Sequence, residues 1–315
     1  MNDSDTNVSF HSSPYHTPVL FYEAIDALQV KSEGVYVDCT FGGGGHSRGI
    51  IDKLGPKGRL IAFDQDADAI KNIPEEDRIV FVPNNFRHLQ RFLRLHGFSK
   101  VDGVLADLGV SSYQFDKGER GFSTRFDGPL DMRMDQRQEN TASSILKKYT
   151  EQQLHKLFEQ YGEVTNSKTL AKQLVQQRSS SPLQTIGQLK ALISPVVKGN
   201  PNKYLAQVFQ ALRIEVNDEM GALKEMLEQI PALLKPGGRV AIITFHSLED
   251  RLVKNFFKNG SFDEQEENPM STEEPKNDLK IITKKPVTAG ADEVKRNARS
   301  RSAKLRVAEK KADSR

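Results

Sequence analysis

The chain has 315 residues, a formal net charge of +3, 37% hydrophobic residues and 28% charged residues, which is the composition of a globular protein with room for two domains. No apolar run approaches the roughly 20 residues that cross a bilayer and no secretory signal opens the sequence, so we expect a cytoplasmic protein without a membrane partner. The single cysteine, Cys39, excludes an internal disulfide, and the seven histidines show no metal-binding spacing, so we expect no metal.

The sequence up to residue 107 alternates expected helices with short apolar strands. Residues 1–15 are polar and predict a disordered arm, after which Thr17 suits the N-cap and Pro18 the first position of a helix. Strands are expected at 35–37, 60–63, 79–82 and 101–106, and helices between them at about 47–54, 66–73 and 88–96. Short, nearly continuous apolar strands separated by helices predict a parallel α/β sheet covered on both faces.

Polar residues follow each of these four strands. They are Asp38, Asp64, the pair Asn84 and Asn85 with Phe86 after it, and Asp107. In parallel sheets of this kind, ligands bind beyond the carboxyl ends of the strands. One polar residue at a strand end would be an ordinary turn residue, whereas four in succession predict a binding site.

After Asp107 the alternation stops. The next strand-like run is 239–244, and a single crossover helix needs far fewer residues than the gap before it. The gap carries helical patterns, among them a capping box formed by Thr150 and Gln153. We therefore expect a discontinuous sheet domain made of residues 16–112 and 206–315, interrupted by a helical insertion of residues 113–205.

Four consecutive glycines, Gly42–Gly45, predict that a ligand approaches this backbone closely. No lysine follows them, so they do not form an ATPase phosphate loop, and Ser47 stands where a dinucleotide loop has its third glycine. Asp64 lies about 20 residues further on, where an acid usually holds a ribose diol. Because NAD, FAD and S-adenosylmethionine all present such a ribose, this spacing leaves the cofactor open.

Residues 234–240, LKPGGRV, resemble the turn that precedes the fifth strand of S-adenosylmethionine-dependent methyltransferases. Together with Asp38, the glycines and Asp64, this turn favours that cofactor. No pyrophosphate then has to be held, and the start of the helix after Gly45 suits the methionine carboxylate.

Further motifs lie along nearly the whole chain. They are HTPVL at 16–20, DCTFGGGGHS at 38–47, DLGVSSYQFD at 107–116, RGFSTRFDGPLDMRMD at 120–135, FQALRIEVNDE at 209–219, FHSLEDRLVK at 245–254 and ARSRSAKLR at 298–306. On these motifs the chain resembles the bacterial 16S ribosomal RNA cytosine N4-methyltransferases, the RsmH or MraW family. It departs from the family pattern at Cys39, where glycine is common, and at Tyr113, where proline is frequent. Neither departure is expected to abolish cofactor binding, although Tyr113 could alter the loop that presents Gln114.

The resemblance implies a Rossmann-type class I S-adenosylmethionine-dependent methyltransferase sheet with an inserted all-helical domain that helps to bind substrate. It implies methyl transfer to the exocyclic N4 of a cytidine in the decoding centre, near the P site, so the partner is 16S rRNA or the small ribosomal subunit. It also allows a homodimer. The implied contacts to S-adenosylmethionine fall on Gly44, Gly45, His46, Asp64, Phe86, Asp107 and Gln114.

Asp107 and His246 are the candidate catalytic residues. The cytosine N4 lone pair is delocalised into the ring, so a carboxylate that accepts its N–H would help to localise it. Asp107 could do this or could bind only the cofactor, and His246 could contact the base, contact the RNA backbone or make a structural hydrogen bond. Phe86 could equally be a core residue, and Asp64 could be a helix N-cap. His46 is expected to contact the cofactor through its backbone.

Residues 280–315 carry twelve Lys and Arg against four acids, which suits nucleic acid but is also typical of a solvated chain end. The acidic segment 261–278 is expected to be a mobile loop. Three alternatives stay open: a methyltransferase for another RNA, a small molecule or a protein; a non-catalytic RNA-binding protein of the same fold; and an NAD oxidoreductase. Candidate phosphate contacts are Arg125, Arg133, Arg137, Arg296, Arg299 and Arg301.

Overall fold

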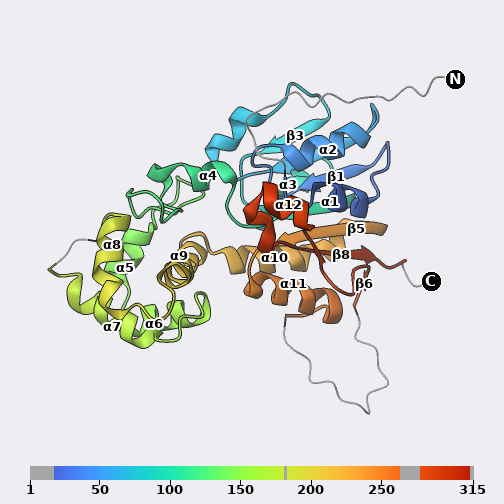
Figure 1. Cartoon of the computed structure of the whole chain (residues 1–315). Coiled ribbons are helices and arrows are strands. Elements are labelled where there is room, and N and C mark those ends of the chain that lie inside the picture. The colour runs from blue at the N-terminus through green and yellow to red at the C-terminus, as the bar shows by residue number, and fades with distance from the viewer. Residues whose placement is uncertain (1–17, 181–182, 263–276, 313–315) are drawn as a thin grey trace, which may run out of the picture.

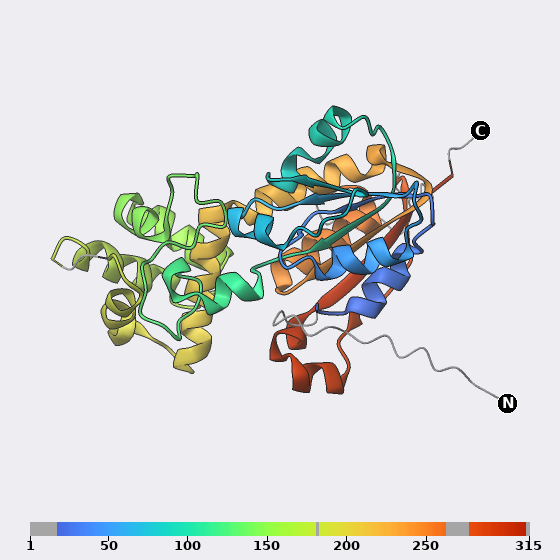
Figure 2. The same cartoon turned by 90° about the horizontal axis from the view of Figure 1, so that it is seen from above.

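The computed structural model describes residues 18–180, 183–262 and 277–312. It has two lobes, one built on a β-sheet and one made of helices, and they lie side by side in both views (Figures 1 and 2). The predicted N-terminal arm and most of the acidic segment 261–278 lie outside the described residues.

Within the described residues, eight strands form one sheet in the order β3-β2-β1-β4-β5-β8-β6, with β7 paired to β8. The first five strands are parallel, and β8 runs antiparallel to β5, so the sheet is mixed where the sequence predicted a parallel one. The strands are β1 Val35–Asp38, β2 Arg59–Phe63, β3 Ile79–Val82, β4 Val101–Asp107, β5 Leu234–Thr244, β6 Leu279–Ile281, β7 Val287–Thr288 and β8 Lys304–Lys310.

Helices cover both faces of the sheet, as predicted. Helices α1 (Phe21–Leu28) and α2 (Gly45–Lys53) pack on one face, and α3 (Leu89–Leu95), α10 (Glu219–Leu233) and α11 (Ser247–Asn259) pack on the other. Because successive side chains of a strand point to opposite faces, neighbouring buried residues belong to different hydrophobic clusters. In β1 and β2 the first face receives Tyr36 and Leu60, and the second receives Val37 and Ile61.

The start of α1 differs from the prediction. The helix begins at Phe21, with Leu20 at its N-cap in a left-handed conformation (φ 51°), so Pro18 lies before the helix and Thr17 lies outside the described residues. Leu20 is fully buried under the sheet. The helix therefore begins three residues later than predicted, with a buried apolar residue instead of a threonine at its N-cap.

The helical lobe has its own core, which extends from Phe122 to Val216. The capping box of Thr150 and Gln153 is present at the start of α6. The predicted domain boundary at residue 205 falls inside α9, whose buried side chains as far as Val216 pack with the helical lobe, so we place that boundary at Asp218. The helices are α4 Ser112–Asp116, α5 Ala142–Lys148, α6 Glu151–Gln160, α7 Ser167–Gln177, α8 Ile186–Ile193 and α9 Pro201–Asn217.

The basic C-terminal region is not a solvated chain end as far as residue 310. After α12 (Ala291–Arg296), strand β8 pairs with β5 through six residues and buries Leu305 and Val307. Arg306 points into the protein and forms two hydrogen bonds, of 2.6 and 3.1 Å, with the carboxylate of Asp250. A buried cation is tolerated here because it is paired.

Two local predictions also change. Residues 235–238 do not separate a helix from a strand, because β5 already begins at Leu234. They bulge out of the sheet, so that Leu234 pairs with Val101 and Arg239 pairs with Gly103. The predicted helix at 66–73 is a 3₁₀ helix over Ala67–Asn72.

Candidate active site

A cavity of about 260 Å³ lies beyond the carboxyl ends of β1 and β4. These two strands are neighbours in the sheet, and the chain order reverses between them, which makes this the switch point where ligands of α/β sheets bind. Predicted residues that line the cavity are Gly45, His46, Asp64, Phe86, Asp107 and Gln114.

The glycine run has three different uses. Gly42 lines the cavity with φ +51°, and its N–H donates to Asp64 Oδ2 at 2.7 Å. Gly44 is the N-cap of α2 with φ +75°; it does not line this cavity, and its N–H donates to the carbonyl of Phe41. A Cβ on Gly45 would lie 2.2 Å from Cγ of Pro18. Backbone turning and packing therefore demand glycine here even before any ligand approaches.

Asp64 is held by the backbone at the cavity wall. Its Oδ2 accepts from Gly42 N–H, and its Oδ1 accepts from Asp66 N–H at 2.8 Å. Burial raises the pKa of Asp64 to about 6, against the lowering effect of these two hydrogen bonds. The alternative role of helix N-cap is filled by Asp66, whose Oδ1 accepts from Asp68 N–H.

Gln114 joins the wall of the cavity to the helical lobe. Its Nε2 donates to Asp66 Oδ2 at 2.6 Å, and its Oε1 accepts from Ser111 N–H in a capping box of α4. Arg120, which is 4% exposed, lies 2.8 Å from the same Asp66 oxygen. The sequence analysis missed Asp66 and Arg120, because their link joins two distant segments.

Asp107 differs from the other strand-end carboxylates. Among the described residues no group donates a hydrogen bond to either of its carboxyl oxygens, and Oδ1 is buried without a partner. Its backbone N–H donates to Thr40 Oγ1 at 2.7 Å, which fixes its place at the strand end. Burial, with Asp38 and Glu249 nearby, raises the pKa of Asp107 well above its usual range.

The side chain of His46 is buried beside Asp107. Its Nε2 lies 3.1 Å from the carbonyl oxygen of Val19, so Nε2 carries the proton and Nδ1 presents a lone pair 3.7 Å from Asp107 Oδ2. Burial lowers the pKa of His46 to about 4, and the Val19 carbonyl only partly offsets this, so the ring is neutral at physiological pH.

Phe86 and Cys39 also line the cavity. Phe86 is partly buried and packs against the main core cluster, so its contact with the core and its access to the cavity coexist. Burial raises the pKa of the Cys39 thiol well above its usual range, so it is not a thiolate nucleophile.

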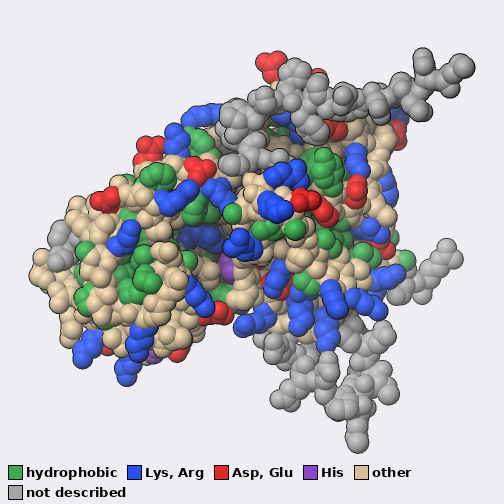
Figure 3. Space-filling model, in the orientation of Figure 1, with side chains coloured by type: hydrophobic (Ala, Val, Ile, Leu, Met, Phe, Trp, Pro, Cys, Tyr) green, Lys and Arg blue, Asp and Glu red, His purple; other side chains and the backbone are tan. Residues whose placement is uncertain are grey.

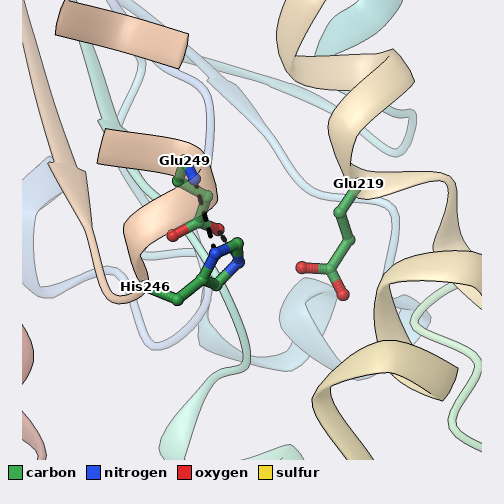
Figure 4. Close-up of side chains that lie close together, drawn as sticks. All are labelled: Glu219, His246 and Glu249. Carbon is green, nitrogen blue, oxygen red and sulfur yellow. Dashed lines mark hydrogen bonds and ion pairs between the residues drawn. The ribbon is translucent and has the colours of Figure 1, made fainter. Parts of the chain in front are cut away.

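A second polar group lies at the β5 end of the cavity, where Figure 4 shows Glu219 reaching from α10 toward His246 and Glu249. His246 is the N-cap of α11: its Nδ1 accepts from Glu249 N–H at 3.4 Å, and the ring does not itself line the cavity. Glu249 and Glu219 do line it, and Arg213 forms a fork with Glu219 at 2.8 and 2.9 Å. Sequence reasoning named only His246 of these four.

Two of the predicted phosphate contacts have acidic partners in their own loop. Arg133 and Arg137 form forks with Asp131 and Asp135, each two residues earlier in the chain. Arg301 is exposed and has no charged partner among the described residues. The local forks stabilise the loop and leave less of each guanidinium free for RNA.

Arg125 and Arg299 join the two lobes near the mouth of the cavity. Both pair with Asp116, at 2.8 and 2.9 Å, and both lie over the ring of Phe115. Arg299 lines the cavity, and its Nη1 is buried without a hydrogen-bond partner. Figure 3 shows Lys and Arg side chains gathered around the hollow between the lobes.

This sheet order, the glycine turn after β1, the acid after β2 and the cavity at the switch point define a class I S-adenosylmethionine-dependent methyltransferase. No helix among the described residues is long and apolar enough to span a membrane.

The chain belongs to the MraW methylase family, whose pattern matches residues 13–311. It is 52% identical over 300 residues to the ribosomal RNA small subunit methyltransferase H of Parabacteroides distasonis, covering 95% of this chain and 98% of that one. Relatives of the same name in Azobacteroides pseudotrichonymphae and Christiangramia forsetii are 54% and 50% identical, each over 94% of this chain and over 97% and 98% of their own lengths.

Proposed function

We propose that this chain transfers a methyl group from S-adenosylmethionine to the exocyclic N4 of a cytidine in the decoding centre of 16S rRNA. Family membership and the names of the relatives support an rRNA substrate, and the motif resemblance supports the N4 position. The observation that carries the proposal is the carboxyl group of Asp107, which faces the cavity without a hydrogen-bond donor from the described residues. Such a group is available to accept a hydrogen bond from a ligand.

The residues around the cavity fit the proposed cofactor. The oxygens of Asp64 each accept one backbone N–H, which leaves lone pairs for the ribose hydroxyls. Phe86 offers a ring face for adenine, and Gly45 and His46 begin α2, whose N-terminus favours a carboxylate. For Gly44 the contact stays a prediction, and its amide is already bonded within the loop.

Bound at this site, the cofactor supplies an electrophilic methyl group on a sulfonium. The residues of the chain supply the other half of the chemistry. Asp107 accepts an N–H of the target amine, localises its lone pair and takes the proton that the amine must lose. His46, held neutral by Val19, keeps a lone pair toward Asp107 and can share that proton. The protonated thiol of Cys39 argues against methylation at C5, which needs a thiolate.

We further propose that the helical lobe and the basic residues around the hollow hold the RNA, with the target nucleotide turned out of its stack. Arg299 is the best placed phosphate contact, because its Nη1 has no hydrogen-bond partner beside the cavity. Action in the cytoplasm follows from a ribosomal substrate. The homodimer stays a prediction that light scattering would test.

The test uses purified protein, labelled S-adenosylmethionine and small ribosomal subunits that lack their native modification. The RNA is digested and the methylated nucleoside is identified by mass spectrometry. We expect N4-methylcytidine at one decoding-centre position. Methylation of a different nucleoside, or cofactor binding without transfer to any RNA tested, would contradict the proposal.

A further inference from the structure

Two of the sequence motifs have no part in the cofactor contacts. Residues 209–219 supply Arg213 from the end of the helical lobe and Glu219 from the start of α10, and residues 245–254 supply His246 and Glu249 from the sheet lobe. The fold brings them together at the β5 end of the cavity, where the side-chain atoms of Glu219, His246 and Glu249 lie within 4.8 Å of one another (Figure 4). Asp107 lines the same cavity, and Glu249 is near enough to Asp107 to contribute, after burial and Asp38, to raising its pKa.

Glu249 is the most firmly held of these residues. Its side chain is 3% exposed, and its Oε2 accepts from Phe245 N–H at 2.8 Å. Its Oε1 lies 3.2 Å from Nε2 of His246, a ring nitrogen that is buried and has no well-formed hydrogen bond. The carboxylate therefore has a fixed place in the cavity wall and retains free lone pairs.

We propose that Glu249 is a second catalytic carboxylate, which accepts one N–H of the target amino group while Asp107 accepts the other. This inference rests on the proposed function. His246 and Arg213 are positioning residues: His246 lies 3.2 Å from the Glu249 carboxylate and caps α11, and Arg213 holds Glu219 beside them.

An exocyclic amine offers two N–H donors, which two acceptors can bind at once. Cytosine N4 carries two N–H groups, whereas uracil presents a keto oxygen at the same place, which two carboxylates would repel. As the N4 lone pair forms its bond to the methyl carbon, the carbon–sulfur bond breaks and its electron pair goes to sulfur. N4 is then positively charged until one proton leaves. Two carboxylates stabilise that charge, and one of them takes the proton.

The two carboxyl groups suit different parts of this step. Burial, Asp38 and Glu249 raise the pKa of Asp107, which makes it the better proton acceptor. Burial also acts to raise the pKa of Glu249, but the contact with His246, the charge of Arg213 and the Phe245 N–H together hold the pKa below its usual range, so Glu249 is an ionised acceptor. Neighbouring groups with oppositely shifted pKa values are a common basis for dividing such roles.

A divalent cation is the competing ligand for Glu219, His246 and Glu249, and the geometry disfavours it. Nδ1 of His246 accepts the Glu249 N–H, so Nε2, the nitrogen beside the carboxylate of Glu249, carries the proton of the ring. A metal needs that nitrogen unprotonated. Arg213 also already supplies a positive charge to Glu219 through both carboxylate oxygens.

The first test compares Glu249→Gln with wild type. Gln keeps the shape and can still accept the Phe245 N–H. We expect the dissociation constant for S-adenosylmethionine, measured by calorimetry, to stay within about twofold, because only contacts to the target base are changed. With saturating small subunits, the single-turnover rate should fall about 10- to 150-fold, the effect of losing one hydrogen bond to a charged group. An unchanged rate would refute the inference.

A second readout is binding of subunits whose target cytidine is replaced by uridine. Wild type should bind these subunits more weakly than subunits that carry the cytidine. In Glu249→Gln the ratio of the two dissociation constants should be smaller, whereas a purely structural role of Glu249 would leave that ratio unchanged. If wild type makes no N4-methylcytidine, the proposed function fails. If wild type makes it and Glu249→Gln does so equally fast, only this inference fails.

Two variants of His246 form a matched pair for its positioning role. His246→Asn keeps an N-cap acceptor but loses the nitrogen beside Glu249, whereas His246→Gln loses the cap and can place an amide there. We expect His246→Asn to keep the thermal stability of wild type but to show a slower single-turnover rate. His246→Gln should show a faster rate than His246→Asn. The reverse pattern would refute this role. Saturable binding of Mn²⁺ or Zn²⁺ to the cofactor-free protein, abolished by Glu249→Gln, would assign the cluster to a metal instead.

Discussion

The substitution Asp107→Asn tests the proposed reaction most directly. Asn has the shape of Asp but lacks its charge and cannot take a proton. Among the described residues no donor contacts the carboxyl oxygens of Asp107, so the change breaks no hydrogen bond of these oxygens within the free protein. Its effect on turnover therefore reports contacts that form only with ligands.

The expected loss can be worked from the contacts. One hydrogen bond to a charged acceptor is worth about 1.5–3 kcal/mol, so the single-turnover rate should fall about 10- to 150-fold from this loss alone. Loss of the proton acceptor can add about 100-fold, the lower end of the range for general base catalysis. S-adenosylmethionine affinity should change little, because Asp64, Phe86 and the α2 N-terminus are untouched.

Asp107→Asn should lower the turnover rate but raise the folding stability at neutral pH. Below the ordinary pKa of 3.8, the Asp107 carboxyl is protonated in both the folded and unfolded states. As pH rises, the unfolded chain ionises first, so stability is lost until pH passes the raised pKa of the folded state. Burial raises this pKa most, Asp38 and Glu249 raise it further, and neutral His46 lies beside the carboxyl group. At pH 7.5, Asp107→Asn should therefore unfold at a higher temperature than wild type.

The assay measures cofactor affinity by calorimetry, single-turnover methyl transfer by rapid quench and unfolding by calorimetric scanning. A variant that is more stable, binds cofactor normally and turns over slowly supports the catalytic role. If cofactor affinity falls and the turnover of bound cofactor does not, Asp107 holds only the cofactor and the reasoning is wrong.

Three further predictions concern the cofactor end of the cavity. Because the pKa of Asp64 is about 6, calorimetry should show S-adenosylmethionine affinity falling about tenfold between pH 7.5 and pH 5, with no such dependence in Asp64→Asn. Gly45→Ala should lower the free energy of unfolding in urea by about 1–3 kcal/mol, because its Cβ would meet Pro18. Arg120→Ala should lower it by about 3–5 kcal/mol, since Asp66 loses a buried partner, and an unchanged urea midpoint would contradict this.

The sheet could be predicted as far as Asp107 because its strands are buried on both faces and read as continuous apolar runs. Strand β8 could not, because Lys304, Arg306 and Lys310 make it read as a basic tail. Arg306 can be buried because it pairs with Asp250 on α11. The sequence around Arg306 does not reveal a partner so distant in the chain.

Some residues of the candidate site could likewise be predicted from the sequence, and others could not. The strand-end rule leads to Asp64 and Asp107, and both line the cavity. Glu249 lies in the first turn of α11, where an acid is ordinarily read as favourable to the helix dipole. Only the fold shows that the carboxylate of Glu249, on α11, lines the same cavity as Asp107, at the end of β4.

The insertion takes part in the site because of where it leaves and rejoins the sheet lobe. It follows β4, so its first residues, including Gln114, form the wall beside the cofactor end, and Arg120 anchors that wall to Asp66. It returns through α9, where Asn217 accepts from Met134 N–H at 2.7 Å and places Glu219 at the other end of the cavity. One inserted lobe thus contacts both the cofactor end and the target end.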